Sequence, residues 1–369
     1  MKRETIKKLF TTLILFVGIS IISFAGNDQR VGQAGGGQLL INPWVRTTGF
    51  GQANSASIHG LEALSLNVAG TAFTEKTELI FASSSWMSGS GINIYSFGLS
   101  QKVGETGVMS LSFMSMDFGD IDITTVDLPD GGLGTFHPTY TNITLAYAKA
   151  FSNSIYGGLA LKILNEGISD MSSSGVALDA GIQYVTGLGK NKAGKRNHEN
   201  LKFGMSMKNV GPTMRYKGDG LSFRGYVPAG TNMTVEQRSA DYELPSLIKI
   251  GIAYDIYLSQ KVDTATKKVT NDHTITFAGN FTSNSFTKDQ IHFGLEYSYK
   301  KMFQIRGGYI YEAGIFDDTR ATAYTGPTGG FSILIPLGKE SKSVFSLDYS
   351  YRSTMNFTGV HSIGARITL

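Results

Sequence analysis

Apolar and polar residues alternate along most of this chain, in segments of about ten residues separated by turn residues. Alternation with a period of two places apolar side chains on one face of a β-strand and polar ones on the other. The segments are residues 77–85, 92–101, 108–116, 139–150, 155–164, 176–185, 201–209, 247–258, 273–282, 291–299, 303–311, 329–337, 344–351 and 361–369. The pattern predicts an all-β protein with fourteen strands, and we find no sign of a second domain beside them.

The length and number of the segments favour a membrane barrel over a soluble β-sandwich, which alternates in the same way. Segments of this length cross a bilayer when tilted, and they exceed the usual soluble strand. An even number of strands places both termini of a bacterial barrel on the periplasmic side. Tyrosines at segment ends fit interfacial girdles, namely Tyr140, Tyr184, Tyr257, Tyr299 and Tyr351. We therefore expect a 14-stranded antiparallel transmembrane β-barrel over residues 77–369, in the outer membrane.

Composition agrees with a barrel. Only 17% of the residues are charged, whereas the chain has 17 Tyr and 22 Phe, and its mean hydropathy is −0.05. A barrel strand shows lipid only every second residue, so mean hydropathy stays near zero although the outer face is apolar. The chain has no cysteine, so no disulfide framework holds it together.

The first 25 residues have the pattern of a signal peptide. A basic start and the apolar run 9–22 precede Ser23-Phe24-Ala25, and we expect cleavage after Ala25. A membrane anchor is the alternative, but the run is shorter than the roughly 20 residues of a spanning helix. Removing this segment takes away four positive charges and one negative charge, which lowers the net charge from +4 to about +1. Nucleic-acid binding therefore loses its main argument.

The lengths of the connections between segments predict how the barrel is oriented in the membrane. With the N-terminus in the periplasm, every second connection is external, and the long ones all fall in that set: residues 117–138, 210–246 and 312–328. The periplasmic set includes the short turns 151–154 and 300–302, together with two longer, Lys-rich connections, 186–200 and 259–272. This asymmetry is typical of porin-like barrels.

The last segment ends at the last residue, Leu369, and its apolar face resembles the sorting signal that barrel-assembly machinery reads. Arg366 belongs to the opposite face of this segment. On a soluble sheet Arg366 would lie on an exposed surface, whereas a barrel offers it a polar lumen.

Residues 26–76 do not alternate and are rich in small residues, as expected of a segment that threads through a crowded space. They contain Gly49-Phe50-Gly51 and later Asn67-Val68-Ala69-Gly70. These motifs resemble the hatch of FadL-type outer-membrane barrels, in which an N-terminal segment plugs the lumen. The resemblance implies hatch roles for Gly49, Gly51, Asn67 and Gly70. Val68 stands where these barrels have a proline, which puts the tight turn in doubt.

Within these barrels the chain resembles the PorV/PorQ group of Bacteroidetes, through Asn42-Pro43-Trp44-Val45-Arg46, the hatch motifs and residues 218–223. That group belongs to the type IX secretion system. The resemblance implies an outer-membrane, lipid-embedded component that docks translocon or attachment-complex proteins, and secreted proteins with C-terminal sorting domains. Exposed apolar residues on external loops fit such contacts. The candidates are Phe118, Leu128, Tyr216, Phe223 and Tyr226.

The alternative is a FadL-like transporter of hydrophobic small molecules. It predicts an apolar pocket in the lumen behind the hatch, and a kink or side opening in one strand. Charged residues at inward positions count against a wholly apolar lumen, namely Lys162, Asp179, Lys202, Lys208, Glu296, Arg306 and Asp348.

No motif predicts an enzyme, a cofactor or a metal. The six histidines are scattered, and Gly189–Lys195 matches a phosphate loop only in part, because Arg196 replaces its hydroxyl residue. Five aspartates between residues 117 and 130 could hold calcium, but a solvated acidic loop is the simpler interpretation.

Overall fold

The computed structural model describes residues 30–192, 194–228, 230–262, 269–318, 320, 322–338 and 343–369. The predicted signal peptide, residues 1–25, lies outside the described residues. In the part described, no helix is long and apolar enough to cross a membrane.

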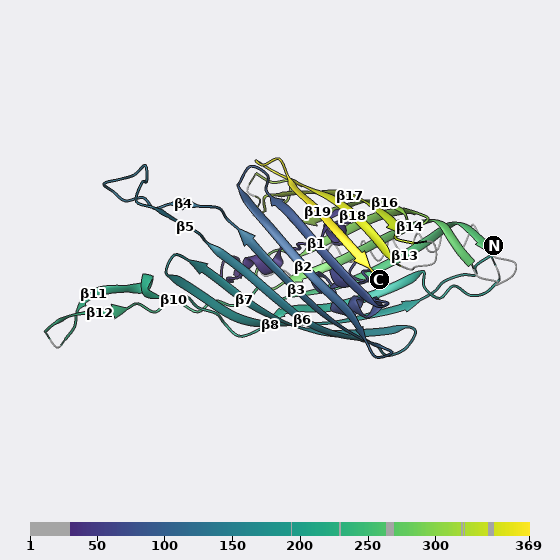
Figure 1. Ribbon diagram of the computed structural model, residues 1–369, viewed down its shortest axis with the longest axis horizontal. Helices are drawn as coiled ribbons and strands as arrows, with labels where there is room; N and C mark the ends of the chain where they lie inside the picture. The colour runs from purple at the N-terminus through teal and green to yellow at the C-terminus, as the bar shows by residue number, and fades with distance from the viewer. Residues whose placement is uncertain are drawn as a thin grey trace.

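Fourteen antiparallel strands form a closed barrel, because each pairs with the next and the last pairs with the first (Figure 1). They are β1 (Thr77–Trp86), β2 (Ile92–Val103), β3 (Gly107–Asp117), β6 (Thr139–Ala150), β7 (Ile155–Ile168), β8 (Met171–Thr186), β9 (Leu201–Val210), β13 (Leu247–Val262), β14 (Val269–Asn284), β15 (Gln290–Tyr299), β16 (Phe303–Glu312), β17 (Tyr324–Pro336), β18 (Val344–Thr354) and β19 (Val360–Thr368). The predicted fold is confirmed. The main difference from the prediction concerns residues 259–272, which were expected to be a connection. Most of these residues belong to strands, because β13 and β14 are longer than expected.

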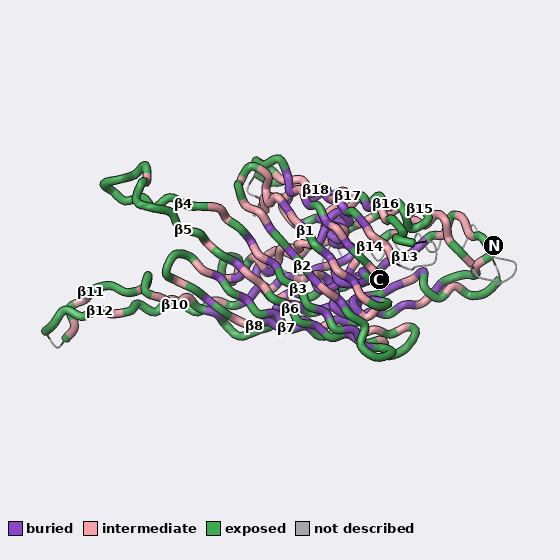
Figure 2. The backbone as a smooth tube through the Cα atoms, in the orientation of Figure 1, coloured by how far each residue is buried: buried purple, intermediate pink, exposed green. Residues whose placement is uncertain are grey.

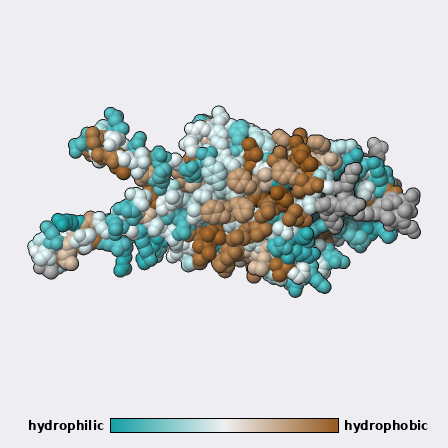
Figure 3. Space-filling view, in the orientation of Figure 1, coloured by the Kyte–Doolittle hydropathy of each residue, from teal (hydrophilic) through white to brown (hydrophobic). Residues whose placement is uncertain are grey.

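Side chains alternate between the lipid face and the lumen along every wall strand. In β19, Ile363 is 62% exposed whereas its neighbour Ser362 is 3% exposed. Figure 2 shows this alternation as a change of colour along the strands, and Figure 3 shows apolar residues gathered over the middle of the barrel. Tyr140 corrects the girdle prediction: it is 1% exposed and packs in the lumen with Ile94 and Met114. Tyr140 is an even-numbered residue of β6, and the even-numbered side chains of this strand point into the lumen. A position near the end of a strand does not change the face to which a side chain points.

Most of residues 30–76 lie inside the barrel, and we call this segment the hatch (Figure 1). Their helices are short: η2 (Gly37–Leu40), α2 (Val45–Gly49), η3 (Leu61–Ser65) and η4 (Val68–Phe73). Trp44, Val45, Leu61, Leu64 and Val68 pack against inward alanines and Ile80 of the wall. This buried cluster is the largest hydrophobic core of the described chain, and it joins the hatch to the barrel.

Two long connections project from one rim as extended fingers (Figure 1). The first finger, residues 118–138, contains β4 (Ile121–Asp122) and β5 (Thr135–Phe136). The second finger, residues 211–246, contains β10 (Lys217–Gly218), η5 (Asp219–Leu221), β11 (Ser222–Tyr226) and β12 (Asn232–Glu236). Because barrels carry their long loops outside the cell, we call this rim the external rim.

Candidate functional site

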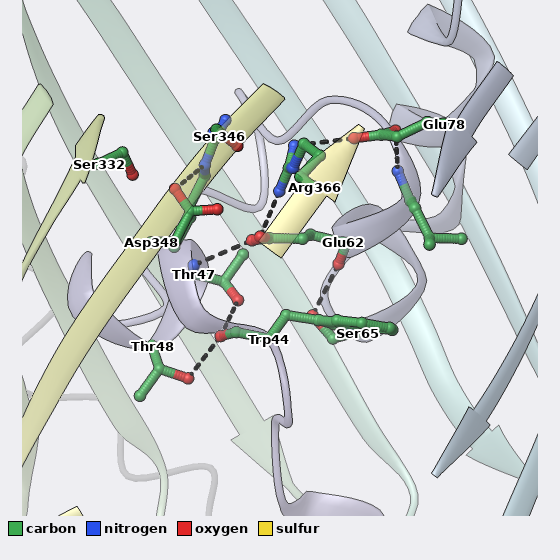
Figure 4. A network of polar contacts seen from close by, with 12 residues as sticks. Trp44, Thr47, Thr48, Glu62, Ser65, Glu78, Ser332, Ser346, Asp348 and Arg366 are labelled. Carbon is green, nitrogen blue, oxygen red and sulfur yellow. Dashed lines mark hydrogen bonds and ion pairs between the residues drawn. The ribbon is translucent and has the colours of Figure 1, made fainter. Parts of the chain in front are cut away.

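Buried ion pairs fix one side of the hatch to the wall (Figure 4). Arg366 of β19 is paired with Glu62 of η3 and, at 2.8 Å, with Glu78 of β1. The Leu61 backbone N–H donates to Glu78 Oε2 at 2.7 Å. Arg46 of α2 is paired with Asp348 at 2.8 Å. The sequence prediction that Arg366 faces a polar lumen is therefore confirmed.

A second set of polar contacts holds the opposite side. Lys162 and Lys208 share Asp179, at 2.8 and 3.5 Å, and Lys208 Nζ also donates to the Leu64 carbonyl at 3.3 Å. The Asn67 side chain donates to the carbonyls of Ser55 (3.1 Å) and Ile182 (3.0 Å). The predicted inward charges thus lie in the lumen, and all seven of them are ion-paired. Together the two sets hold the hatch as a plug.

Among the predicted hatch glycines, Gly49 and Gly51 lie against the wall, whereas Gly70 lies against another part of the hatch. A Cβ atom at Gly49 would lie 3.2 Å from the Gly329 carbonyl oxygen, and one at Gly51 would lie 3.0 Å from Gly308 Cα. Gly70 packs against the Ile58 carbonyl. The turn after Asn67 forms without the proline, because the Asn67 carboxamide oxygen accepts a hydrogen bond from the Ala69 N–H at 3.2 Å.

A cavity of ≈ 410 Å³ lies between the external face of the hatch and the wall. This volume falls within the range of ligand pockets. Both tryptophans of the chain, Trp44 and Trp86, line the cavity, as do Leu39, Ile41 and Leu64 of the hatch. The rest of the lining is more polar, and includes Lys249, Lys288 and Arg352. The cavity is therefore amphipathic, which differs from the apolar pocket that the transporter hypothesis predicts.

A second, more open hollow of ≈ 590 Å³ lies between the start of the hatch and the bases of the two fingers. It shares Gly37, Ile41 and Trp86 with the cavity, so the two hollows adjoin. Arg30, the first described residue, pairs with Glu243 of the second finger at 2.5 Å. The described chain thus starts at the external rim and descends into the lumen, passing between the two hollows.

Two tyrosines of the second finger cover this path. The hydroxyls of Tyr216 and Tyr242 donate to Glu166 at 3.0 and 3.1 Å, and Tyr242 is also bonded to Ser173 at 2.8 Å. Burial raises the pKa of Tyr242 to about 12, and the nearby Glu166 carboxylate adds to the rise. Gly35 lies directly under the Tyr242 ring. We call this set of contacts the tyrosine latch.

One seam of the wall is irregular next to the cavity. The pairing between β16 and β17 ends at Tyr309 and Pro327, and the β17–β18 register shifts between Tyr324 and Thr328. Proline lacks an N–H group, so it fits a sheet only at an edge or a bulge. Gly326, with a φ of +106°, lies beneath the Tyr309 ring. The register of β17 is therefore irregular at this point, and the kink or side opening that the transporter hypothesis predicts stays a prediction.

The five predicted contact residues divide into two groups. Leu128, Phe223 and Tyr226 are exposed on the fingers. Phe118 and Tyr216 instead turn toward the barrel: Phe118 packs against the cluster around Ile94, and Tyr216 belongs to the latch. The structure does not bring the two groups together.

Sequence reasoning missed the cavity cations Lys249 and Arg352. Alternation within residues 247–258 places Lys249 inward, so that signal was present. Arg352 lies one residue beyond the predicted end of its segment, while β18 continues to Thr354. Among the described residues there is no group of His, Asp or Glu side chains that could hold a metal ion.

Comparison with known proteins shows similarity in structure alone. No protein-family model and no curated protein matches the sequence. The Pseudomonas putida toluene transporter TodX aligns with a TM-score of 0.51 and 10% identity, over 89% of this chain and 97% of TodX. The Ralstonia pickettii toluene transporter TbuX aligns with a TM-score of 0.48 and 12% identity, over 89% and 97%. The fold, a closed 14-stranded antiparallel barrel, is thus similar to that of TodX.

Proposed function

We propose that this protein carries hydrophobic or amphipathic small molecules into or across the outer membrane. The observation that carries the proposal is the pair of adjoining hollows, which lead from the external rim to the hatch past Gly37, Ile41 and Trp86. The fold it shares with TodX, a toluene transporter, supports the same function.

The arrangement suggests a route. A molecule enters the outer hollow between the finger bases and passes the first hatch residues into the cavity. There it meets the hatch, which the ion pairs Arg366–Glu62 and Arg46–Asp348 hold in place. It leaves either after a local shift of the hatch or sideways, at the β16–β17 seam beside Tyr309.

Filling the junction of the two hollows tests this function. A side chain at Gly37 has room, because no other atom lies within 4 Å of the Cβ position. Gly37→Phe should therefore block the path without unfolding the protein, and Asn153→Phe in the periplasmic turn is the matched control. The readout is binding of the hydrophobic fluorophore N-phenyl-1-naphthylamine by purified protein in amphipol. Equal binding by Gly37→Phe and the control would contradict the proposal.

A second function is favoured by the fingers. Both project beyond the barrel and expose apolar side chains, including Val126, Leu128, Phe223 and Tyr226. Together with the PorV/PorQ resemblance, these exposed side chains support docking of type IX translocon or attachment-complex proteins and their secreted cargo. Replacing residues 121–136 with a short Gly-Ser linker should abolish co-purification of such partners. Retention of every partner by this variant would exclude the first finger as their contact.

A further inference from the structure

The cavity has more positive than negative charge. Five cations line it, namely Lys162, Lys208, Lys249, Lys288 and Arg352, whereas Glu312 is the acid in its lining. Asp179 compensates Lys162 and Lys208 from the wall. Five cations against these two carboxylates leave three positive charges without a counter-ion. A pocket for neutral hydrocarbons has no need of them.

Lys249 carries the first of these charges. It is 5% exposed, and its Nζ donates to Thr282 Oγ1 at 3.1 Å. Across the described ranges it forms no ion pair. A buried charge is costly to a fold unless it is paired, so a bound anion would remove an existing penalty.

Arg352 carries the second positive charge that has no counter-ion. Its guanidinium lies 3.2 Å from the centroid of the Tyr324 ring, and its Nε is buried without a hydrogen-bond partner. The nearby Glu312 carboxylate accepts a hydrogen bond from Gln290 at 2.8 Å and is not ion-paired with Arg352 within the described residues. A guanidinium with a free N–H suits a carboxylate or phosphate oxygen.

The apolar part of the lining defines the other half of a ligand. Leu39, Ile41 and Trp44 belong to the hatch and face the same cavity as the two cations. An inorganic anion would leave this apolar surface unused, and a neutral hydrocarbon would leave the cations unpaired. A monocarboxylate would compensate one buried cation of the two.

We propose that the cavity binds an amphipathic dianion, of which an alkyl phosphate is the simplest example. Its headgroup pairs with Lys249 and Arg352, and its tail lies against Leu39, Ile41 and Trp44. The inference rests on the proposed small-molecule function and specifies the ligand class for the same cavity.

A chain-matched series of ligands tests the inference. Dodecyl phosphate, dodecanoate and dodecanol share one tail and differ in headgroup charge, and a phosphate monoester is a dianion at pH 8. Intrinsic fluorescence reports binding directly, because both tryptophans line the cavity. For the full-length protein in amphipol, dodecyl phosphate should bind at least tenfold more tightly than dodecanoate, and dodecanol should bind most weakly.

Two variants locate the headgroup. Lys249→Met and Arg352→Gln should each weaken binding of dodecyl phosphate about tenfold, close to one charge-assisted hydrogen bond of about 1.4 kcal/mol. Their affinity for dodecanol should change much less than their affinity for dodecyl phosphate, which shows that the cavity is intact. Lys190→Met, in a periplasmic connection, is the control that should alter neither.

The outcomes separate the two proposals. Equal affinity for the three ligands would overturn the dianion inference and leave small-molecule binding standing. Inorganic phosphate binding as tightly as dodecyl phosphate would overturn the inference too, because the tail would then contribute nothing. Absence of any fluorescence change with all three ligands would overturn both proposals.

Discussion

Arg366, on the last strand of the barrel, is ion-paired with Glu62 of the hatch, 304 residues earlier in the chain. The terminal strand therefore closes the wall and anchors the plug at the same time. The pair is buried, and Glu78 completes it from the neighbouring strand at 2.8 Å.

Removing the arginine should destabilise the barrel strongly. Arg366→Met leaves Glu62 and Glu78 buried without a cation, and breaking a buried pair in this way costs about 3–5 kcal/mol. Equilibrium unfolding in guanidinium measures the loss. The double variant Arg366→Met with Glu62→Gln should recover part of it, because one uncompensated charge is gone. If the single variant unfolds like the parent protein, the ion pair does not hold the hatch.

A side chain at Gly51 should loosen the plug. Gly51 has a φ of +65°, and its Cβ position lies 3.0 Å from Gly308 Cα, so alanine meets both backbone strain and the wall. We expect Gly51→Ala to cost about 1–3 kcal/mol in the free energy of unfolding. Gly37→Ala is the control, because its Cβ position is open. Equal stability of the two variants would show that the close approach is not needed.

The tyrosine latch should control access to the lumen. Tyr242→Phe removes hydrogen bonds to Glu166 and Ser173, each worth about 1 kcal/mol. Hydrogen exchange of residues 33–37 should therefore speed up in this variant, but not in Tyr226→Phe, which changes an exposed tyrosine of the same finger. Unchanged exchange would mean that the latch does not cover the hatch.

The same latch should open at high pH. The pKa of Tyr242 is raised from 10.0 to about 12, so the folded state favours the neutral phenol. The stabilisation that the neutral Tyr242 phenol gives to the folded state is complete below pH 10 and is lost as the pH rises toward 12. Exchange of residues 33–37 should accelerate within this window in the parent protein and show a weaker pH step in Tyr242→Phe. A step at neutral pH would point to another group.

A charged side chain on the lipid-facing side of the wall should oppose insertion of the barrel into the membrane. Ile363 faces lipid, and an arginine on the lipid face of a barrel costs about 2–4 kcal/mol near the midplane. Ile363→Arg should lower the folded fraction in a lipid refolding assay. Val126→Arg, at a fully exposed position of the first finger, should refold normally. Normal refolding of Ile363→Arg would place this face in water.

The alternation of residues predicted the wall well, since β6 begins and ends at the residues expected for segment 139–150. It also predicted which way Arg366 faces, because parity is a local property. Its partner Glu62 could not be predicted, since the path of the hatch depends on packing across the whole lumen. The same reason applies to the cavity, whose lining comes from eleven strands and the hatch. Phe118 turned inward because it packs against the apolar cluster around Ile94, and Tyr216 because its hydroxyl donates to Glu166.

Mass analysis of the protein extracted from native membranes in amphipol tests the proposed small-molecule function most directly. We expect one equivalent of a non-covalently bound amphiphile on the parent protein, and its loss in Gly37→Phe but not in Asn153→Phe. Protein that carries no small molecule, or a molecule retained equally by Gly37→Phe, would contradict the proposed small-molecule function. A ligand-free barrel that co-purifies with secreted proteins would instead favour the docking function of the fingers.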